Sequence, residues 1–261
     1  GKYFDCSYIG GFRLNYCEIT SNYYSKWLGK DNILDIESEQ CQFIYSSERN
    51  KIQLGYTTQY DLILFYQPNR MIVSYGNKIL PYLENLKRQL QELKSLEEIK
   101  DTLNNRLEKT VHHNLKFVFD KLPTYEIKSV VLKENQYYEY LEFFKRNNPN
   151  CENTDWLEEY FIGMTKERTC CGFFLDKTLV SCTDSPCMPY MSDAVQEIGI
   201  NTIEDYRGRG YATDACVLCA QEIVKSGKCP QWSTSAENVA SQKLARKVGF
   251  IKFADVLTVT L

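Results

Sequence analysis

The sequence lacks any feature that would direct the chain into a membrane or onto nucleic acid. No apolar run in it approaches the ~20 residues that a helix needs to span a bilayer. Acidic and basic residues nearly balance, with a formal net charge of −3 at pH 7, so no overall field attracts nucleic acid or an anionic membrane. We therefore expect no nucleic acid and no membrane among the partners of this protein.

A signal peptide is also missing from the start of the sequence. The first residues, Gly1-Lys-Tyr-Phe-Asp-Cys6, lack the apolar core that such a peptide requires. We therefore predict a cytoplasmic protein. Its eleven cysteines are then expected to be reduced thiols, most of them packed as small hydrophobic side chains.

Histidine is scarce, which argues against a metal site. The two histidines are adjacent, His112-His113, and lie far along the sequence from Cys216-x-x-Cys219, a pair on one face of a predicted helix. A zinc site would need a second pair of ligands, and Cys182 and Cys187 are the only nearby candidates. We therefore predict no metal.

The composition is typical of a globular protein. Hydrophobic residues make up 43% and charged residues 25% of 261 residues, enough chain for a sizeable core and two domains. No internal repeat or low-complexity tract interrupts it. We predict an N-terminal α+β domain with a helical bridge over residues 1–120, and a second domain over residues 121–261.

Residue patterns in the first half predict strands followed by two helices. Short β-prone runs occur at Ile52–Gly55, Leu62–Tyr66 and Arg70–Tyr75, and the last two are predicted to form a hairpin. Apolar residues from Ile79 to Leu93 then recur at helical spacing. Ser95-Leu-Glu-Glu98 resembles a capping box that begins a second helix, reaching Val111. Because this cap breaks the heptad, we favour two helices that cover a sheet over a coiled-coil dimer.

The second half shows a regular alternation of strands and helices. Periodicity predicts, in order, a strand (Tyr125–Leu132), two helices (Asn135–Arg146 and Thr154–Gly163), a hairpin (Cys170–Leu175 with Leu179–Thr183), a strand (Val195–Ile200), a helix (Thr213–Lys225), a strand (Gln231–Ser235), a helix (Val239–Val248) and a terminal strand from Ile251. This order predicts an α/β fold around a mixed sheet.

A glycine-rich turn joins the strand ending near Ile200 to the helix that follows it. Its residues, Arg207-Gly-Arg-Gly-Tyr-Ala212, allow a tight turn at a helix N-terminus. Free amides and the positive end of the helix dipole there attract anions, and Arg207 and Arg209 add charge. The Lys-Ser/Thr of a P-loop and the spacing of a dinucleotide-binding motif are both missing. The expected ligand is a phosphate or pyrophosphate.

The same turn carries a family resemblance. Arg-x-x-Gly-x-Ala, at Arg207, Gly210 and Ala212, resembles the acyl-CoA pyrophosphate loop of the GNAT superfamily of N-acetyltransferases. Asn238-Val-Ala-Ser241 and Leu244-Ala-Arg-Lys-Val-Gly-Phe250 resemble the next two segments of that family, in the right order. The chain is similar in particular to a bacterial subgroup of two-part GNAT proteins.

The resemblance implies a GNAT fold over residues ~124–261, preceded by a smaller α+β domain that could alternatively be a degenerate copy of the same fold. It also implies acetyl-CoA as cosubstrate. The residues then expected to bind it are Ile200, Asn201, Thr202, Arg207, Gly208, Arg209, Gly210, Tyr211, Ala212, Thr213, Asn238 and Ser241. Asn238 would also cap its helix in either case, and Trp232 is expected in the core.

The acid and the base are less clearly marked. Relatives often carry a carboxylate base on the strand before the loop, and Glu197 is the only acid within Val195–Thr202, so we predict it as the general base. A structural Glu197, a deprotonation relayed by water and Asp193 are the alternatives. Many relatives place a Tyr where this chain has Ala245. Ser235, Ser241 or a water would then protonate the leaving thiolate, unless acid catalysis is dispensable.

The function implied is transfer of an acetyl group from acetyl-CoA to a primary amine of a small molecule or peptide, by direct attack in a ternary complex. A GNAT-fold sensor that binds acyl-CoA without efficient transfer is the alternative. Residues 1–120 would shape the acceptor pocket or form a homodimer interface.

Overall fold

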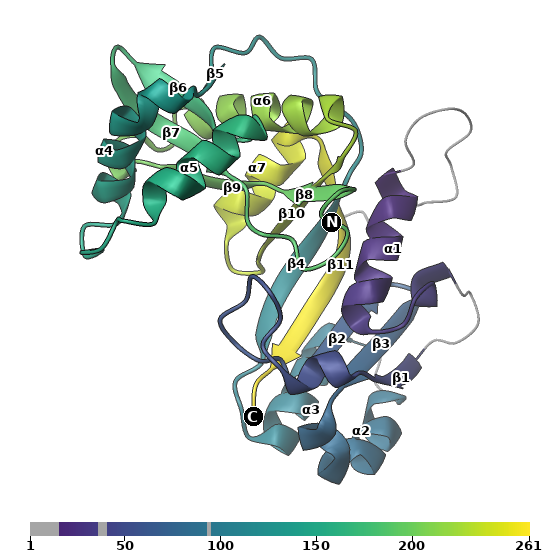
Figure 1. Cartoon of the computed structure of the whole chain (residues 1–261). Coiled ribbons are helices and arrows are strands. Elements are labelled where there is room, and N and C mark those ends of the chain that lie inside the picture. The colour runs from purple at the N-terminus through teal and green to yellow at the C-terminus, as the bar shows by residue number, and fades with distance from the viewer. Residues whose placement is uncertain (1–15, 36–40, 93–94) are drawn as a thin grey trace.

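The computed structural model describes residues 16–35, 41–92 and 95–261, which form a mixed α/β fold (Figure 1). Its first half contains α1 (Tyr16–Leu28), β1 (Cys41–Tyr45), β2 (Leu62–Gln67), β3 (Arg70–Tyr75), α2 (Leu83–Leu90), α3 (Leu96–Leu107) and β4 (His112–Phe119). Its second half contains β5 (Val130–Val131), α4 (Tyr137–Asn147), α5 (Leu157–Lys166), β6 (Cys171–Leu175), β7 (Thr178–Asp184), β8 (Val195–Glu197), β9 (Gly199–Thr202), α6 (Tyr211–Lys225), β10 (Cys229–Ser235), α7 (Val239–Val248) and β11 (Phe250–Val259). The predicted α/β class is therefore confirmed.

Two sheets organise the described residues. One has seven strands in the order β1-β3-β2-β11-β4-β10-β8, and the other has four in the order β5-β6-β7-β9. β4 lies between β10 and β11, and β11 also pairs with β2. Main-chain hydrogen bonds therefore cross the boundary placed at residue 120, and the division into two domains stays a prediction.

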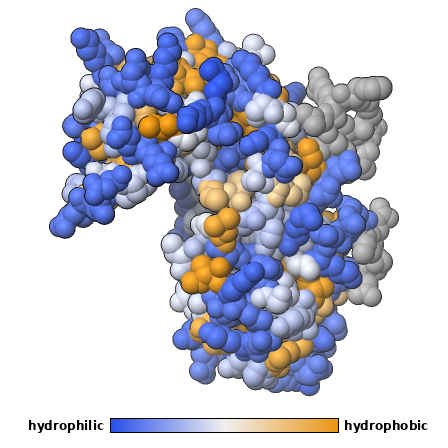
Figure 2. All heavy atoms as spheres, in the orientation of Figure 1, coloured by the Kyte–Doolittle hydropathy of each residue, from blue (hydrophilic) through white to orange (hydrophobic). Residues whose placement is uncertain are grey.

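Helices cover both faces of this framework. α1 lies against β4 and β10, where Tyr24 and Trp27 are buried. Trp232 of β10 is buried in another core, with residues of α6 and α7, and this confirms its predicted core position. Because side chains alternate along a strand, α1 and the pair α6 and α7 lie on opposite faces of β10. α4 and α5 form a lobe that overhangs an indentation in the surface (Figure 2).

α2 and α3 cover the sheet, as predicted. Their residues Leu86, Leu90 and Leu103 share a buried cluster with Leu64 of β2 and Leu257 of β11. The Ser95 hydroxyl accepts a hydrogen bond from the Glu98 amide at 3.2 Å, which confirms the cap of α3.

Several elements differ from the sequence prediction in the first half. Ile52–Gly55 forms no strand, and α1, β1 and β4 were not predicted. α3 ends at Leu107 because Glu108 adopts the left-handed conformation, with φ of 52°. β4 was not predicted because apolar residues recur at helical spacing up to Val111, directly before this strand begins. α1 is rich in Tyr, a strand-favouring residue, and packing against the sheet overrides that local preference.

In the second half the helices and the hairpin of β6 and β7 are confirmed. The predicted strand Tyr125–Leu132 is reduced to Val130–Val131. The predicted strand Val195–Ile200 is divided at Ile198 into β8 and β9, which belong to different sheets.

Most cysteines in the described residues are free thiols. Cys216 and Cys219 are fully buried in the core beside α6, as predicted for packing residues. Cys17 is disulfide-bonded, so the expectation of reduced thiols was wrong at this position. No group of His, Cys, Asp and Glu within the described ranges is arranged to hold a metal ion. Nor does that part of the chain contain a helix long and apolar enough to cross a membrane.

Asp214 fixes the start of α6 to the segment before β5. Its carboxylate is 3% exposed and accepts hydrogen bonds from the Ser129 amide at 2.7 Å and the Lys128 amide at 3.1 Å. In Asp214→Asn, one carboxylate oxygen becomes an NH₂ group that cannot accept, and the negative charge that strengthens the bonds from the two amides is lost. We expect a loss of about 2–3 kcal/mol in the free energy of unfolding.

Urea denaturation measures this loss, with Asp205→Asn as the matched control. Asp205 is an exposed acid in the turn before α6. The free energy of unfolding of the Asp205→Asn variant should therefore differ from that of wild type by less than about 0.5 kcal/mol. Equal stabilities for the two variants would contradict this role of Asp214.

Candidate functional site

The site begins where one run of chain passes from one sheet to the other. β8 pairs in parallel with β10, from Val195 opposite Cys229 to Glu197 opposite Gln231. The Ile198 amide then donates to the Gln231 carbonyl at 3.0 Å. Beyond this point β9 pairs with β7, while β10 continues beside β4. A gap therefore opens between β9 and β10.

A tight turn leads from β9 into α6. Gly208 and Gly210 have φ of 78° and 86°, a backbone conformation that residues with a Cβ rarely adopt. Gly210 is the N-cap of α6 and offers no side chain, so the first-turn amides of the helix remain available to a ligand. Arg207 donates from Nε to the Thr202 carbonyl at 3.2 Å and holds the turn against β9.

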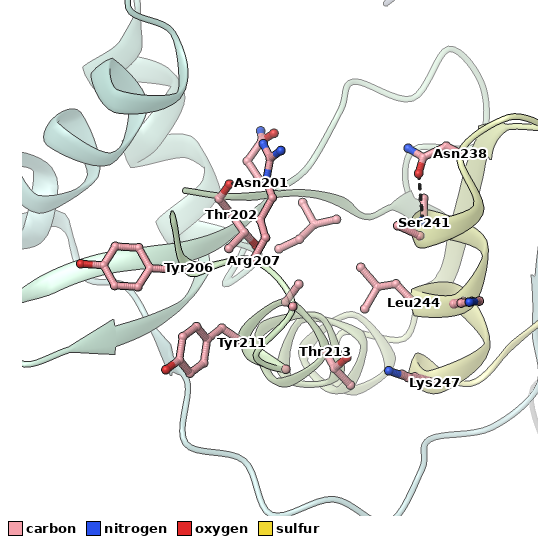
Figure 3. A pocket seen from close by; sticks show the side chains of 16 residues that line it. Asn201, Thr202, Tyr206, Arg207, Tyr211, Thr213, Asn238, Ser241, Leu244 and Lys247 are labelled. Atoms are coloured by element: carbon pink, nitrogen blue, oxygen red, sulfur yellow. Dashed lines mark hydrogen bonds between the residues drawn. The ribbon is translucent and has the colours of Figure 1, made fainter. Parts of the chain in front are cut away.

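A cleft of about 610 Å³ lies over this turn, between β9, α6 and α7 (Figure 3). It brings together every residue expected to bind the cosubstrate except Arg209. These lining residues are Ile200, Asn201, Thr202, Arg207, Gly208, Gly210, Tyr211, Ala212, Thr213, Asn238 and Ser241. The guanidinium of Arg209 lies instead over the ring of Tyr206, 5.6 Å from its centroid.

The cleft is basic. Arg207, Lys243 and Lys247 line it, and no Asp or Glu of the described residues does so. Together with the positive end of the α6 dipole, these cations favour a ligand with several phosphate charges. Sequence reasoning missed Lys243 and Lys247. Their spacing of four residues in a predicted helix places them on one face, and this could have revealed them.

The start of α7 closes the far side of the cleft. The Asn238 side chain accepts a hydrogen bond from the Ser241 amide at 3.0 Å, which confirms its capping role (Figure 3). Trp232 donates from Nε1 to the Ser241 hydroxyl oxygen at 3.2 Å. The hydroxyl proton of Ser241 therefore remains available for donation to a bound group.

Of the predicted proton donors, Ser241 lines the cleft and Ser235 does not. The Ser235 hydroxyl accepts a hydrogen bond from the Glu237 amide at 3.2 Å, in the turn that follows β10. Ala245 is fully buried in the core beneath α7 and does not line the cleft.

Glu197 lies in a small cavity of about 100 Å³ on the α1 face of the sheet. Its carboxylate accepts a short hydrogen bond from the Ser233 hydroxyl, across the point where the strands diverge. Lys116 lines the same cavity, and its ammonium group lies 5.0 Å from the centroid of the Trp27 ring. Burial lowers the pKa of Lys116, and the charge of Glu197 opposes that shift.

The other acids near the site differ in position. Asp193 is exposed, in the turn before β8. Asp184, which sequence reasoning missed, ends β7 and pairs with Gly199 of β9. Burial, and after it the charge of Glu197, raise the pKa of Asp184. No sequence motif marks Asp184, because only the pairing of β7 with β9 brings it to the site.

A family model for the GNAT acetyltransferases matches residues 72–255. The chain belongs to the GNAT acetyltransferase family. The resemblance drawn from the turn after β9 is thereby confirmed, and the match begins earlier than the expected ~124, at Ile72 in β3. GNAT acetyltransferases use acetyl-CoA and act on small-molecule or peptide acceptors.

Solved structures of other proteins are similar to this chain, and the first of them shares its fold. An acetyltransferase of the GNAT family from Colwellia psychrerythraea is 18% identical, with a TM-score of 0.51 over 69% of this chain and 72% of that one. A putative GNAT acetyltransferase from Novosphingobium aromaticivorans is 21% identical, with a TM-score of 0.44 over 57% and 63%. A putative acetyltransferase from Salmonella typhimurium, solved with its cofactor acetyl-CoA, is 10% identical, with a TM-score of 0.42 over 52% and 95%. No curated protein matches the sequence.

Replacement of Gly210 by Asp tests the cleft. A Cβ at Gly210 meets no atom within 4 Å, so the new carboxylate would stand free beside the first turn of α6. It should repel the phosphates of acetyl-CoA and lower the affinity by about tenfold or more. Calorimetry and the rise in melting temperature with acetyl-CoA measure this loss.

Gly227→Asp is the matched control. Gly227 follows the other end of α6, has φ of 85° and also has open space around a Cβ. It carries the same backbone strain without touching the cleft, so acetyl-CoA affinity should stay within about twofold of wild type. Unchanged affinity in a folded Gly210→Asp variant would contradict the placement of the phosphates.

Proposed function

We propose that the protein transfers an acetyl group from acetyl-CoA to a primary amine, by direct attack within a ternary complex. One observation carries this proposal above all. The basic cleft runs from the N-terminus of α6 to the gap where β9 leaves β10, so a single ligand can contact both. A CoA thioester has phosphates for one end and an acyl group for the other.

The residues of the cleft would divide the binding of acetyl-CoA among them. The first-turn amides of α6 and the side chain of Arg207 would hold the pyrophosphate, and Lys243 and Lys247 would neutralise further phosphate charge. One edge of β9 pairs with β7, and its other edge faces the gap. Main-chain groups of Ile200–Thr202 would therefore hold the acyl arm and stabilise negative charge on the thioester carbonyl oxygen.

The chemistry supplied by acetyl-CoA is that of a thioester: a C–N bond forms to the amine, and the C–S bond breaks. The chain must remove one proton from the amine and provide one to the leaving thiolate. We assign the first task to Glu197, which the Ser233 hydroxyl holds beside the point where the strands diverge. For the second, Ser241 is favoured over Ser235, because only Ser241 lines the cleft.

A second function has one observation in its favour. Ala245, where many relatives have a Tyr, is buried, so no phenol from this position of α7 reaches the cleft. A protein that binds acyl-CoA as a sensor would not need such an acid. Transfer remains the better supported function, because a sensor requires neither the carboxylate of Glu197 beside the gap nor an open hydroxyl at Ser241.

Release of free CoA thiol separates the two functions. With acetyl-CoA and a panel of primary amines, an acetyltransferase produces free thiol at a rate that depends on the amine. A sensor would show saturable binding of acetyl-CoA and no thiol above the rate of spontaneous hydrolysis. We expect amine-dependent release from the wild-type protein.

Glu197→Gln tests the base. The amide keeps the size of the side chain but cannot take a proton, so turnover should fall by roughly 10²–10⁴. Affinity for acetyl-CoA should be nearly unchanged, since Glu197 does not line the cleft. The residual rate should rise with pH, as more of the amine loses its own proton.

Asp193→Asn is the comparison variant, because Asp193 is the alternative base and is exposed. Its turnover should stay within about twofold of wild type. Loss of turnover in Asp193→Asn with an active Glu197→Gln would transfer the role to Asp193. A Glu197→Gln variant that is less stable but fully active per folded molecule would assign Glu197 a structural role.

A further inference from the structure

A second pocket lies on the other side of β9, under the lobe of α4 and α5. Its volume is about 390 Å³, the size of a small-molecule site. Five aromatic side chains from α4 and the start of α5 line it: Tyr140, Phe143, Phe144, Trp156 and Tyr160. Ring centroids are 5.7 Å apart for Phe144 and Trp156, and 6.0 Å apart for Trp156 and Tyr160. These three rings thus form a continuous aromatic row.

Asp184 supplies the only charge in this lining. Among the described residues, no Lys, Arg or His lines the pocket, and its other polar side chains are neutral. Within the residues that the structure describes, no hydrogen bond or ion pair engages the Asp184 carboxylate. Asp184 is partly buried, and a carboxylate that has lost part of its water without gaining a partner favours a cationic one.

Gly199 explains why the carboxylate can lie so close to β9. Asp184 and Gly199 are opposite each other in the β7–β9 pair. A Cβ at Gly199 would collide with the carboxylate oxygens. The absence of a side chain at this position lets the charge rest directly against the strand that borders the gap.

The aromatic pocket and the cosubstrate cleft meet at β9. Asn201 lines both of them, and it pairs with Cys182, two residues before Asp184. A ligand in the aromatic pocket would therefore have its charged end beside the strand that, under the proposed function, holds the acyl arm.

We propose that this pocket binds the acceptor, and that it selects a primary amine in its ammonium form on an apolar or aromatic body. The ammonium group pairs with Asp184 and the ring faces, and the apolar body packs against the aromatic row. An amino acid with a free carboxylate is disfavoured, because the pocket offers no cation for it and Asp184 repels it. This inference names the acceptor class and rests on the proposed function.

A cation that cannot be acetylated tests binding apart from catalysis. Calorimetry with benzyltrimethylammonium, on the full chain saturated with CoA, should show a single saturable site. Phenethylamine should compete for it, whereas phenylalanine, the same body with a carboxylate added, should compete at least about tenfold more weakly. Equal competition by the two compounds would overturn the proposed selectivity.

Variants identify the residues. Asp184→Asn keeps the shape of the side chain and removes its charge, and it should weaken benzyltrimethylammonium binding by about tenfold to hundredfold. Trp156 is 49% exposed, so Trp156→Leu should fold normally. Loss of its ring face should weaken binding by about threefold to thirtyfold.

Two controls match these variants. Glu159→Gln removes an exposed carboxylate next to Tyr160, and Tyr138→Leu removes an aromatic ring of α4 that is 78% exposed and outside the pocket. Both should bind the cation within about twofold of wild type. If all four variants bind it equally, the site lies elsewhere and the inference is wrong.

The outcomes also separate this inference from the proposed function. Failure of the wild-type chain to bind CoA would refute the proposed function and, with it, the acceptor site. Binding of CoA without binding of benzyltrimethylammonium would refute the acceptor class alone. Binding of both, with loss of the cation in Asp184→Asn and Trp156→Leu, supports the inference.

Discussion

The site depends on one constraint: the chain from Val195 to Thr202 belongs to two sheets in turn. A strand can pair along both edges only while both neighbours stay beside it. After Gln231, β10 follows β4 while β9 follows β7, and no strand of the described residues pairs with the edge of β9 toward β10. Main-chain groups on such an edge need another partner, and an extended acyl arm can provide one. The gap is therefore a consequence of how the strands pair in the two sheets. The turn after β9 and the N-terminus of α6 lie at its open end.

Charge is distributed unequally around this gap. The side formed by α6 and α7 presents Arg207 and two lysines and no acid. On the other side, Glu197 and Asp184 lie close enough for the charge of Glu197 to raise the pKa of Asp184. An anionic cosubstrate and a cationic acceptor would each find the complementary charge on its own side. They would meet at β9, which bears no side chain at Gly199 to separate them.

The first half of the chain contributes directly to this arrangement. β4 lies between β10 and β11, so it helps to set the course of β10 away from β9. Lys116 of β4 and Tyr24 of α1 line the small cavity around Glu197. Both precede the region in which the sequence motifs occur. The match to the family model from Ile72 onward is consistent with a sheet that runs through both halves.

The sequence by itself determined the family, the glycine-rich turn before α6 and eleven of the sixteen residues that line the cleft. These features are local: glycines at positive φ, a helix N-terminus and a capping Asn238 act within a few residues of chain. Helices of the second half were equally predictable from their periodicity. Only the tertiary structure decided the division of the strand at Ile198, the position of β4, the exclusion of Ser235 from the cleft and the place of Asp184. Each of these depends on pairing between distant strands, and such pairing leaves no signal at fixed sequence spacing.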